Sequence, residues 1–200
     1  MARPREFDTE AALNGAMNVF WSLGYDGASL PDLLTGMGIS RGSLYKAFTD
    51  KKTLFLTVLE HYEADQVAKA VTALTDKTTP DGLDRIRAVF GNVVATARGG
   101  DRRGCLLCTA AAGPANDDPD ISAAVARLLD RMEQGFRAAL DDAPRLNDRD
   151  DTARATMAQL LLTQYVGLRI LTRSQAPVET IEQSVTALSA MLSPQAAAGS

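Results

Sequence analysis

The stretch from residue 29 to residue 48 reads Ser-Leu-Pro-Asp-Leu-Leu-Thr-Gly-Met-Gly-Ile-Ser-Arg-Gly-Ser-Leu-Tyr-Lys-Ala-Phe. Ser29 and Asp32 have the spacing of a capping box, and the proline between them falls in the first turn, where a helix needs no N–H. Gly38 then breaks the chain, and Ser40 can cap another short helix over 41–48. The stretch therefore predicts two short helices joined by a turn of three or four residues that contains glycine.

Helical spacing of apolar residues recurs along the rest of the chain. A first helix is predicted over 8–23, with Asp8 or Thr9 as its cap and Gly24 at its end. A fourth helix is expected to start after Asp50 and to continue to about residue 74. Runs of alternating β-branched residues are missing, so we predict an all-α fold. Further helices are expected near residues 81–97, 105–112, 121–140, 157–171 and 178–192.

Composition narrows the class of protein. The 200 residues are 46% hydrophobic and 23% charged, which is typical of a soluble chain with a core. The first six residues lack the apolar region of a secretory signal, and no apolar run approaches the roughly 20 residues of a membrane helix. We therefore expect a cytoplasmic protein without membrane contact. Two cysteines and one histidine are too few for a structural zinc site, and no catalytic constellation or cofactor motif occurs, so neither metal nor cofactor nor enzymatic activity is expected.

The net charge of −4 argues against a polybasic protein that coats nucleic acid or membrane. Residues 1–60, however, contain six basic and seven acidic residues, and the basic ones gather in the N-terminal arm and between positions 41 and 52. Lys46 and Lys51 supply positive charge there. A basic face on a nearly neutral domain is therefore available.

The predicted third helix has the residue types of a DNA reader. Gly42 lets a helix N-terminus approach DNA closely, and Arg41 and Ser43 can bond to base edges or phosphates. Tyr45 carries a hydroxyl on a rigid aromatic arm. A helix followed by two capped short helices around the Gly38 turn is what a helix-turn-helix DNA reader requires. The alternative is a small three-helix packing unit with Tyr45 half-buried and the lysines solvated.

A known family shares these landmarks. The segment from residue 13 to residue 59 resembles the signature of TetR-family transcriptional repressors, carried by Phe20, Gly24-Tyr25, Ser29-Leu30, Leu33, Gly38 to Tyr45, Phe48, Lys51 and Leu54-Phe55. Leu34 and Gly36 depart from the alanines that this family usually has, which concerns the packing of the second helix. The resemblance implies a helix-turn-helix DNA-binding domain over 1–50, a bridging helix from about 51, and a helical domain over 51–194 that binds a small effector and dimerises. Residues 195–200 are expected to form a flexible tail.

The resemblance also implies which side chains hold DNA. Ser29, Tyr45 and Lys51 match the positions that hold the phosphate backbone in the family, which sets register without reading sequence. The complete predicted DNA-binding set is Ser29, Ser40, Arg41, Gly42, Ser43, Tyr45, Lys46 and Lys51.

The last two predicted helices indicate dimerisation. Apolar residues of the final helix follow steps of 3, 4, 3 and 4, which is a narrow seam suited to helix packing. The helix before it is apolar on nearly all sides and needs more burial than one face of a monomer supplies. We predict a four-helix interface between two copies, formed by Leu161, Tyr165, Leu168, Val178, Ile181, Val185, Leu188 and Leu192; alternatively, the seam packs within one chain.

Two further groups of residues are candidate sensors. Cys105 and Cys108 follow Arg102 and Arg103 at a predicted helix start, where guanidiniums and free amides would stabilise a thiolate; alternatively, both cysteines are small buried residues. His61 lies near the apolar face of the fourth helix. A candidate effector pocket combines His61, Phe90, Met132, Phe136 and Tyr165, although such stripes are usually ordinary core.

Together these observations favour a homodimeric repressor that binds a pseudo-palindromic operator and is released by a small effector. The alternatives are a repressor that senses electrophiles or oxidants through Cys105, an activator or dual regulator, and a helical adaptor without DNA binding.

The acidic loops around Asp117-Asp118 and Asp148 to Asp151 lack the spacing of a calcium loop and are interpreted as solvated caps.

Overall fold

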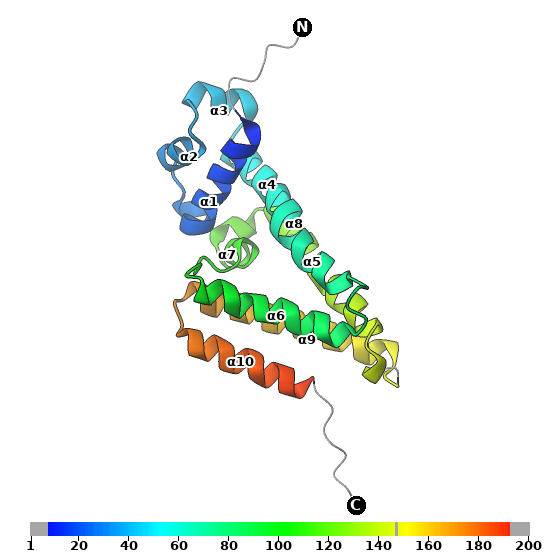
Figure 1. Cartoon of the computed structure of the whole chain (residues 1–200). Helices are drawn as coiled ribbons and strands as arrows, with labels where there is room; N and C mark the ends of the chain where they lie inside the picture. Colours follow the sequence, from blue (N-terminus) through cyan, green and yellow to red (C-terminus); the bar gives the residue numbers. More distant parts are fainter. Residues whose placement is uncertain (1–7, 147, 193–200) are drawn as a thin grey trace, which may run out of the picture. The chain divides into compact units, whose positions relative to one another are not determined.

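A computed structural model describes residues 8–146 and 148–192, and these residues form helices and loops without a strand. The all-α prediction is confirmed. The helices of Figure 1 are α1 (Thr9–Gly27), α2 (Leu30–Met37), α3 (Arg41–Ala47), α4 (Lys51–Tyr62), α5 (Ala68–Thr75), α6 (Gly82–Arg98), α7 (Leu106–Ala112), α8 (Pro119–Asp141), α9 (Asp151–Arg173) and α10 (Val178–Met191). The predicted tail over 195–200 and the basic arm at the N-terminus lie outside the described residues.

The chain divides into two compact units. The first contains the described residues up to Val67 together with Leu106–Leu128, and the second contains Ala68–Cys105 and the chain from Leu129 onward. The units do not follow the domain boundary predicted at residue 50, because α4, α7 and the first part of α8 belong to the same unit as α1–α3. The division at residue 50 into a DNA-binding domain and a regulatory domain stays a prediction.

Aromatic side chains form the core of the first unit. Phe20 of α1 meets Phe55 of α4 edge to face with ring centroids 4.8 Å apart, and Trp21 meets Tyr62 in the same way at 5.1 Å. These four side chains are buried, and such pairs add to the stabilisation from apolar burial. The aromatic pairs fix α4 against α1.

The short helices begin where capping predicts. The Ser29 hydroxyl accepts a hydrogen bond from the Asp32 amide, and the Asp32 carboxylate accepts one from the Ser29 amide, which completes the capping box. Gly38 ends α2 in the left-handed region with φ of 64°, where glycine is favoured. Ser40 then caps α3 by accepting from the Ser43 amide at 3.1 Å. The predicted helix-turn-helix segment is therefore formed, with α3 ending at Ala47 rather than at 48.

Two predicted helices have irregularities that the sequence pattern did not indicate. Gly24 is non-helical, with φ of 75° and ψ of 169°, but a further turn follows it, so α1 extends to Gly27. The helix predicted over 51–74 is formed by α4, a π-helical segment η1 (Glu63–Val67) and α5. A π segment inserts one extra residue into a helical turn and marks positions where regular packing changes. Here Val67, the last residue of η1, is also the last residue of the first of the two chain segments that make up the first compact unit.

In the second unit, α6, α9 and α10 lie side by side (Figure 1). Phe90 of α6 and Phe136 of α8 are buried between apolar neighbours. Arg85 of α6 is also buried; its guanidinium donates to the Leu74 carbonyl at 2.9 Å and to the Asp142 carboxylate at 2.6 Å. This buried arginine joins the end of α5 to the end of α8 and was not anticipated from the sequence.

The acidic loops do cap helices, as predicted. The Asp118 carboxylate accepts from the amides of Asp120 and Ile121 at the start of α8, and Asp150 accepts from the Ala153 amide at the start of α9. Within the described part of the chain, no helix is long and apolar enough to cross a membrane.

Candidate nucleic-acid interface

The short helix α3 presents its polar side chains to solvent. Arg41, Gly42, Tyr45 and Lys46 are exposed, and Ser43 is half-buried. The Tyr45 side chain is 49% exposed although the residue follows the buried Leu44, and the Arg41 guanidinium lies 5.8 Å from its ring centroid. A hydrogen-bonding cation and a hydroxyl therefore stand together on the outer face of α3.

Ser29 and Ser40 stabilise the starts of two helices in the first unit. Each hydroxyl caps a helix, and the Ser40 Oγ also lies 3.0 Å from the Ser43 Oγ. A capping serine still exposes its oxygen at a helix N-terminus, where the amides favour anions. Their contacts with DNA stay a prediction, and their first role is to set where α2 and α3 begin.

Lys51 is held at the start of α4 by its surroundings. Its ammonium lies 4.6 Å from the centroid of the Tyr25 ring, a cation–π arrangement. Partial burial lowers the pKa of Lys51, because removing water disfavours the charged form. Beside it, Asp50 caps α4 through the Thr53 amide at 2.7 Å, and this bond lowers the pKa of Asp50. The lysine is thus placed next to a helix N-terminus that is already capped.

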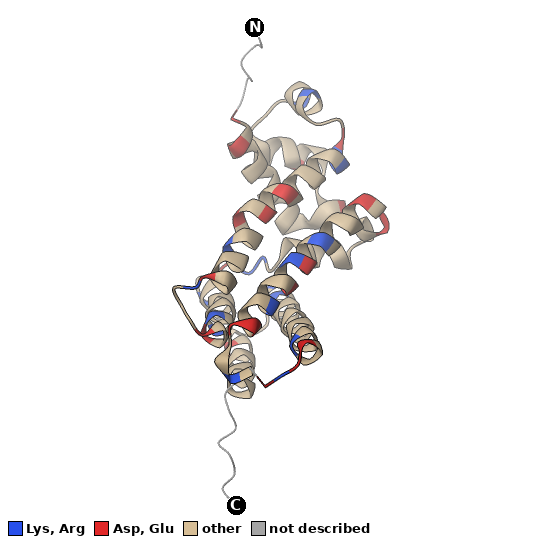
Figure 2. Cartoon of the chain, turned by 90° about the vertical axis from the view of Figure 1, so that its right-hand side faces the viewer, with Lys and Arg blue, Asp and Glu red and all other residues tan. Residues whose placement is uncertain are grey.

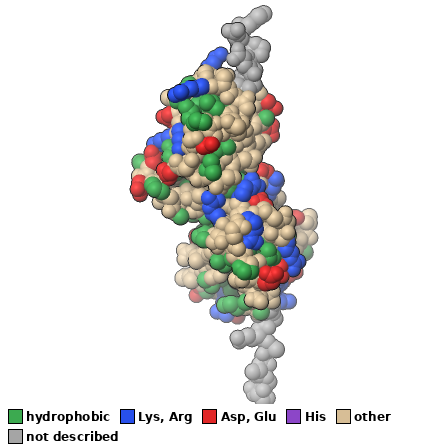
Figure 3. Space-filling view, turned by 90° about the vertical axis from the view of Figure 1, so that its left-hand side faces the viewer, with side chains coloured by type: hydrophobic (Ala, Val, Ile, Leu, Met, Phe, Trp, Pro, Cys, Tyr) green, Lys and Arg blue, Asp and Glu red, His purple; other side chains and the backbone are tan. Residues whose placement is uncertain are grey.

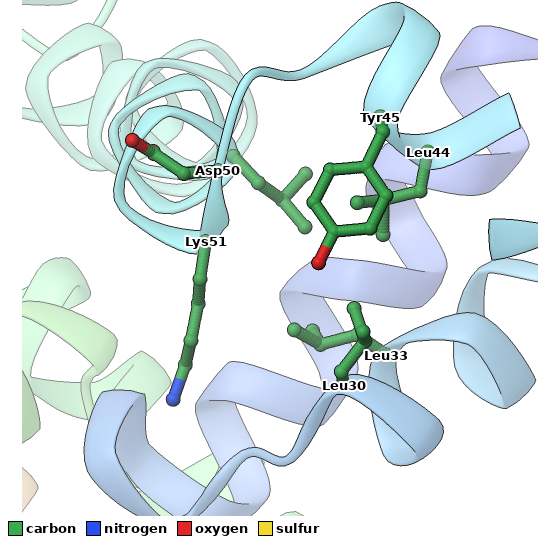
Figure 4. A pocket seen from close by; sticks show the side chains of 7 residues that line it. Leu30, Leu33, Leu44, Tyr45, Asp50 and Lys51 are labelled. Atoms are coloured by element: carbon green, nitrogen blue, oxygen red, sulfur yellow. The ribbon is translucent and has the colours of Figure 1, made fainter. Parts of the chain in front are cut away.

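Figure 4 shows a small pocket between these groups. Tyr45 comes from α3 and Lys51 from the first turn of α4; in this view the Tyr45 ring lies close to Leu44 and Leu33, and Lys51 lies to their left. The lining consists of Leu30, Leu33, Leu44, Tyr45, Asp50, Lys51 and Leu54. The structure therefore brings the two predicted phosphate-binding residues Tyr45 and Lys51 to the rim of one hollow.

Charge is distributed unevenly over the described surface. In Figure 3, basic side chains lie beside apolar ones at the upper end of the first unit. In the view of Figure 2, acidic and basic residues are interspersed along the helices, and no continuous basic face is seen from this side. A local basic surface on an acidic protein is what limited contact with a phosphate backbone requires.

Comparison with known proteins agrees with this geometry. Residues 12–58 match the family described as bacterial regulatory proteins, tetR family. The uncharacterized HTH-type transcriptional regulator YezE of Bacillus subtilis is 30% identical over 190 residues, which cover 92% of this chain and 96% of YezE. The chain belongs to the TetR family. It is therefore a DNA-binding transcriptional regulator whose helix-turn-helix is formed by α2 and α3.

Two further relatives of this TetR-family chain are informative. The HTH-type transcriptional repressor ComR of Escherichia coli is 47% identical over 60 residues, covering 30% of this chain and 29% of ComR. A structure of the TetR family regulator CifR in complex with a 26bp double-strand operator DNA has 30% sequence identity and a TM-score of 0.78. That alignment covers 92% of this chain and 99% of CifR.

The residues of the predicted effector pocket belong to both compact units, and the pocket stays a prediction. Phe90, Phe136 and Tyr165 contact one another in the second unit, with ring centroids 5.8 to 6.1 Å apart, and Met132 is buried. His61 belongs to the first unit, where its Nε2 lies 2.8 Å from the Asn14 Oδ1. The three aromatic rings form one cluster, whereas His61 has a hydrogen-bonding partner on α1.

The predicted dimer residues fall into two groups. Leu161, Leu168, Ile181 and Val185 are buried within a single chain, because α10 packs against α6 and α9. Tyr165, Val178, Leu188 and Leu192 are partly exposed. Burial within one chain leaves these four side chains little surface for a partner subunit, and the predicted dimer interface stays a prediction. The exposed large apolar side chains on these helices are Leu160, Ile170 and Met191.

Both cysteines lie in the interior, as in the second of the two alternatives that the sequence left open. Cys105 and Cys108 are buried, with 6% and 7% of their surfaces exposed. The Arg103 guanidinium pairs with Asp101 at 2.7 Å, and Arg102 donates to the Ala176 carbonyl. α7 begins at Leu106, so Cys105 precedes the helix. A role in sensing stays a prediction, and the geometry favours two buried thiols.

Sequence reasoning missed one polar cluster in the first unit. Lys52 of α4 lies between the carboxylates of Asp118 and Asp120, residues far away in the chain. No local spacing signals this contact, because it depends on how the start of α8 packs beside α4.

Proposed function

We propose that this TetR-family regulator is a homodimeric, cytoplasmic repressor that binds a pseudo-palindromic operator and is released by a small effector. The observation that carries the proposal is the outer face of α3, where Arg41, Tyr45 and Lys46 are exposed beside the capped start of α4. A relative of 30% identity and similar fold is bound to operator DNA, which supports the same use of this face.

The proposed contacts with DNA are of two kinds, to base edges and to phosphates. Arg41 is suited to base edges in the major groove, since a guanidinium can donate two parallel hydrogen bonds to guanine. Tyr45 and Lys51, at the rim of the pocket, are suited to a phosphate and therefore to setting register. This arrangement gives a sequence-dependent contact flanked by sequence-independent ones.

A partner subunit fits an exposed face of α9 and α10. On α9, Leu160, Thr163, Gly167 and Ile170 are exposed at steps of 3, 4 and 3, which places them on one side of the helix. A Cβ at Gly167 would meet nothing within 4 Å, so a second helix can approach there closely. Met191 of α10 is 76% exposed. We propose that these residues, in place of the buried seam, form the dimer interface.

The effector is proposed to act on the second unit. The aromatic cluster of Phe90, Phe136 and Tyr165 offers apolar surface, and Tyr165 is only half-buried. An effector can change DNA affinity only through different affinities for two conformers of the protein. In this proposal it favours a conformer whose two recognition helices no longer match successive major grooves.

Selection of duplexes from a random library by the full-length protein tests the proposal. We expect a selected sequence with two-fold symmetry, and native mass spectrometry should find at least one pair of chains on each duplex. Retention should fall steeply with salt, as for phosphate-dominated binding. Failure to select any duplex would contradict the repressor and favour a helical adaptor. An asymmetric site occupied by one chain would contradict the dimer.

A further inference from the structure

Lys52 is clamped by two carboxylates. Its ammonium lies 2.7 Å from an Asp118 oxygen and 2.7 Å from an Asp120 oxygen. The Lys52 and Asp118 side chains are only about one-third exposed, at 33% and 31%. Lys52 is the second residue of α4, and the acids lie at the start of α8. The cluster therefore connects two helix beginnings within the first unit.

Other hydrogen bonds already fix both sides of this ion-pair cluster, the Asp118 carboxylate and the first turn of α4. The Asp118 Oδ1 accepts hydrogen bonds from the Asp120 and Ile121 amides at 3.0 and 3.3 Å, which leaves Oδ2 directed at Lys52. The first turn of α4 is likewise fixed by its Asp50 cap. Because one carboxylate both caps α8 and binds Lys52, little additional conformational entropy is lost when the ion pair forms.

The helix dipole of α4 explains why Lys52 needs carboxylates beside it. A lysine in the first turn lies at the positive end of the helix dipole, where a cation is unfavourable. Asp118 and Asp120 offset this repulsion and raise the pKa of Lys52. Two carboxylates around one ammonium leave the cluster with a net negative charge, which suits it poorly to a phosphate. The neighbouring Lys51 instead lies over the Tyr25 ring, at the rim of the pocket.

We propose that Lys52 is a positioning residue for DNA binding: its clamp on Asp118 and Asp120 holds the start of α4, and with it Lys51, to the start of α8. The proposal rests on the repressor function proposed above. A second ion pair joins α8 to the segment that directly follows α4, between Arg127 of α8 and Glu63 of η1 at 2.8 Å. Displacement of α8 is thereby transmitted to the helix that presents Lys51.

Amide hydrogen exchange on the DNA-free, full-length protein tests the clamp itself. Lys52→Gln should accelerate exchange in the first turns of both α4 and α8 by about two- to five-fold, the size expected for a well-placed surface ion pair. Lys52→Arg, which can still bridge both acids, should restore protection. Arg98→Gln is the matched control, because it also removes one positive charge and one ion pair, with Glu182 in the second unit. Unchanged exchange at the start of α8 in Lys52→Gln would overturn the proposal.

Salt dependence of binding to a library-selected duplex separates positioning from direct contact. A positioning role predicts that Lys52→Gln loses about two- to five-fold in affinity with an unchanged slope of log affinity against log salt. The double variant Asp118→Asn, Asp120→Asn, which keeps a capping side chain, should lose the same amount, and the losses should not add. A slope reduced by about 0.9 with tighter binding by the double variant would instead make Lys52 a phosphate contact. If no duplex is selected, the repressor function fails, and the exchange experiment still decides whether the clamp exists.

Discussion

Gly15 of α1 and Gly36 of α2 meet backbone to backbone. A Cβ on Gly15 would stand 2.0 Å from the Gly36 carbonyl oxygen, and a Cβ on Gly36 would stand 2.4 Å from the Val19 side chain. A side chain on Gly15 would therefore clash with the backbone of α2, whereas a side chain on Gly36 would chiefly require the Val19 side chain to move. This contact also explains why Gly36 can replace the alanine that is usual in the family, since Gly36 lies against the Gly15 backbone.

Gly15→Ala should therefore lower the free energy of unfolding. The added methyl group must displace the backbone of α2, and overpacking of this kind costs about 1–3 kcal/mol. Gly91→Ala is the matched control: it lies inside α6, and its Cβ would meet nothing within 4 Å, so it should stabilise the protein by about 0.5–1 kcal/mol. Denaturant unfolding followed by circular dichroism measures both changes. Equal effects of the two substitutions would contradict the close crossing.

Charge introduced on the proposed dimer face should separate the subunits without unfolding them. Gly167→Glu places a carboxylate at the centre of the exposed face of α9, where a partner would bury it unpaired. Sedimentation equilibrium at micromolar concentration should find a dimer for the unmodified chain and a monomer for this variant, while Gly91→Glu should remain dimeric. Val185→Glu should instead lose folded structure, since Val185 is buried within one chain. A dimeric Gly167→Glu variant would place the interface elsewhere.

The Arg85–Asp142 ion pair should make the free energy of unfolding depend on pH in the acidic range. Lys77 and Arg85 both hold the pKa of Asp142 below its usual 3.8. Stabilisation from the pair is therefore complete above about pH 3.8 and is lost as the pH falls through the lowered folded-state pKa. Asp142→Asn should cost about 1–3 kcal/mol at pH 7, because it leaves a buried guanidinium without its carboxylate.

Asp142→Asn should lower the free energy of unfolding less at acidic pH than at pH 7. As the pH falls through the lowered folded-state pKa of Asp142, the difference between Asp142→Asn and the unmodified protein should shrink, because the carboxylate then becomes protonated. Asp141→Asn is the control, since Asp141 is largely exposed and its surface ion pairs with Arg137 and Arg154 are worth about 1 kcal/mol or less. A difference for Asp142→Asn that is independent of pH would contradict this account of the pair.

Buried thiols should react slowly. Cys105 and Cys108 are each less than a tenth exposed, so a disulfide reagent at neutral pH should label them far more slowly in the native protein than in denaturant. Absorbance of the released thiol follows both rates. Fast labelling of native protein that disappears in Cys105→Ser would restore the sensor hypothesis based on that residue.

Local signals in the sequence were sufficient for most of the fold. Capping by Ser29, Ser40 and Asp50 depends only on neighbours in the chain, and so the starts of α2, α3 and α4 were predicted correctly, whereas α9 begins six residues before its predicted start near 157. The π-helical turn over Glu63–Val67 has no capping signal; its only local mark is a step of five residues between the buried Tyr62 and Val67, where a regular helix has steps of three or four. The additional turn after Gly24 was missed because glycine usually ends a helix.

The site was predictable where it depended on one helix. Exposure of Arg41, Tyr45 and Lys46 follows from the position of Leu44 on the inner face of α3. The dimer seam was harder, since Ile181 and Val185 have the spacing of any buried stripe, whether it packs on α6 or on a partner. Contacts such as Lys52 with Asp118 depend on the packing of distant segments and have no signature in one sequence.

The central claim is that the outer face of α3 binds DNA. Fluorescence anisotropy with a library-selected duplex, comparing the unmodified chain with the triple variant Arg41→Ala, Tyr45→Ala, Lys46→Ala, tests it most directly. Each good base contact is worth about 1–3 kcal/mol, so the folded triple variant should bind at least about tenfold more weakly. A triple variant with native circular dichroism and unchanged affinity would contradict the claim.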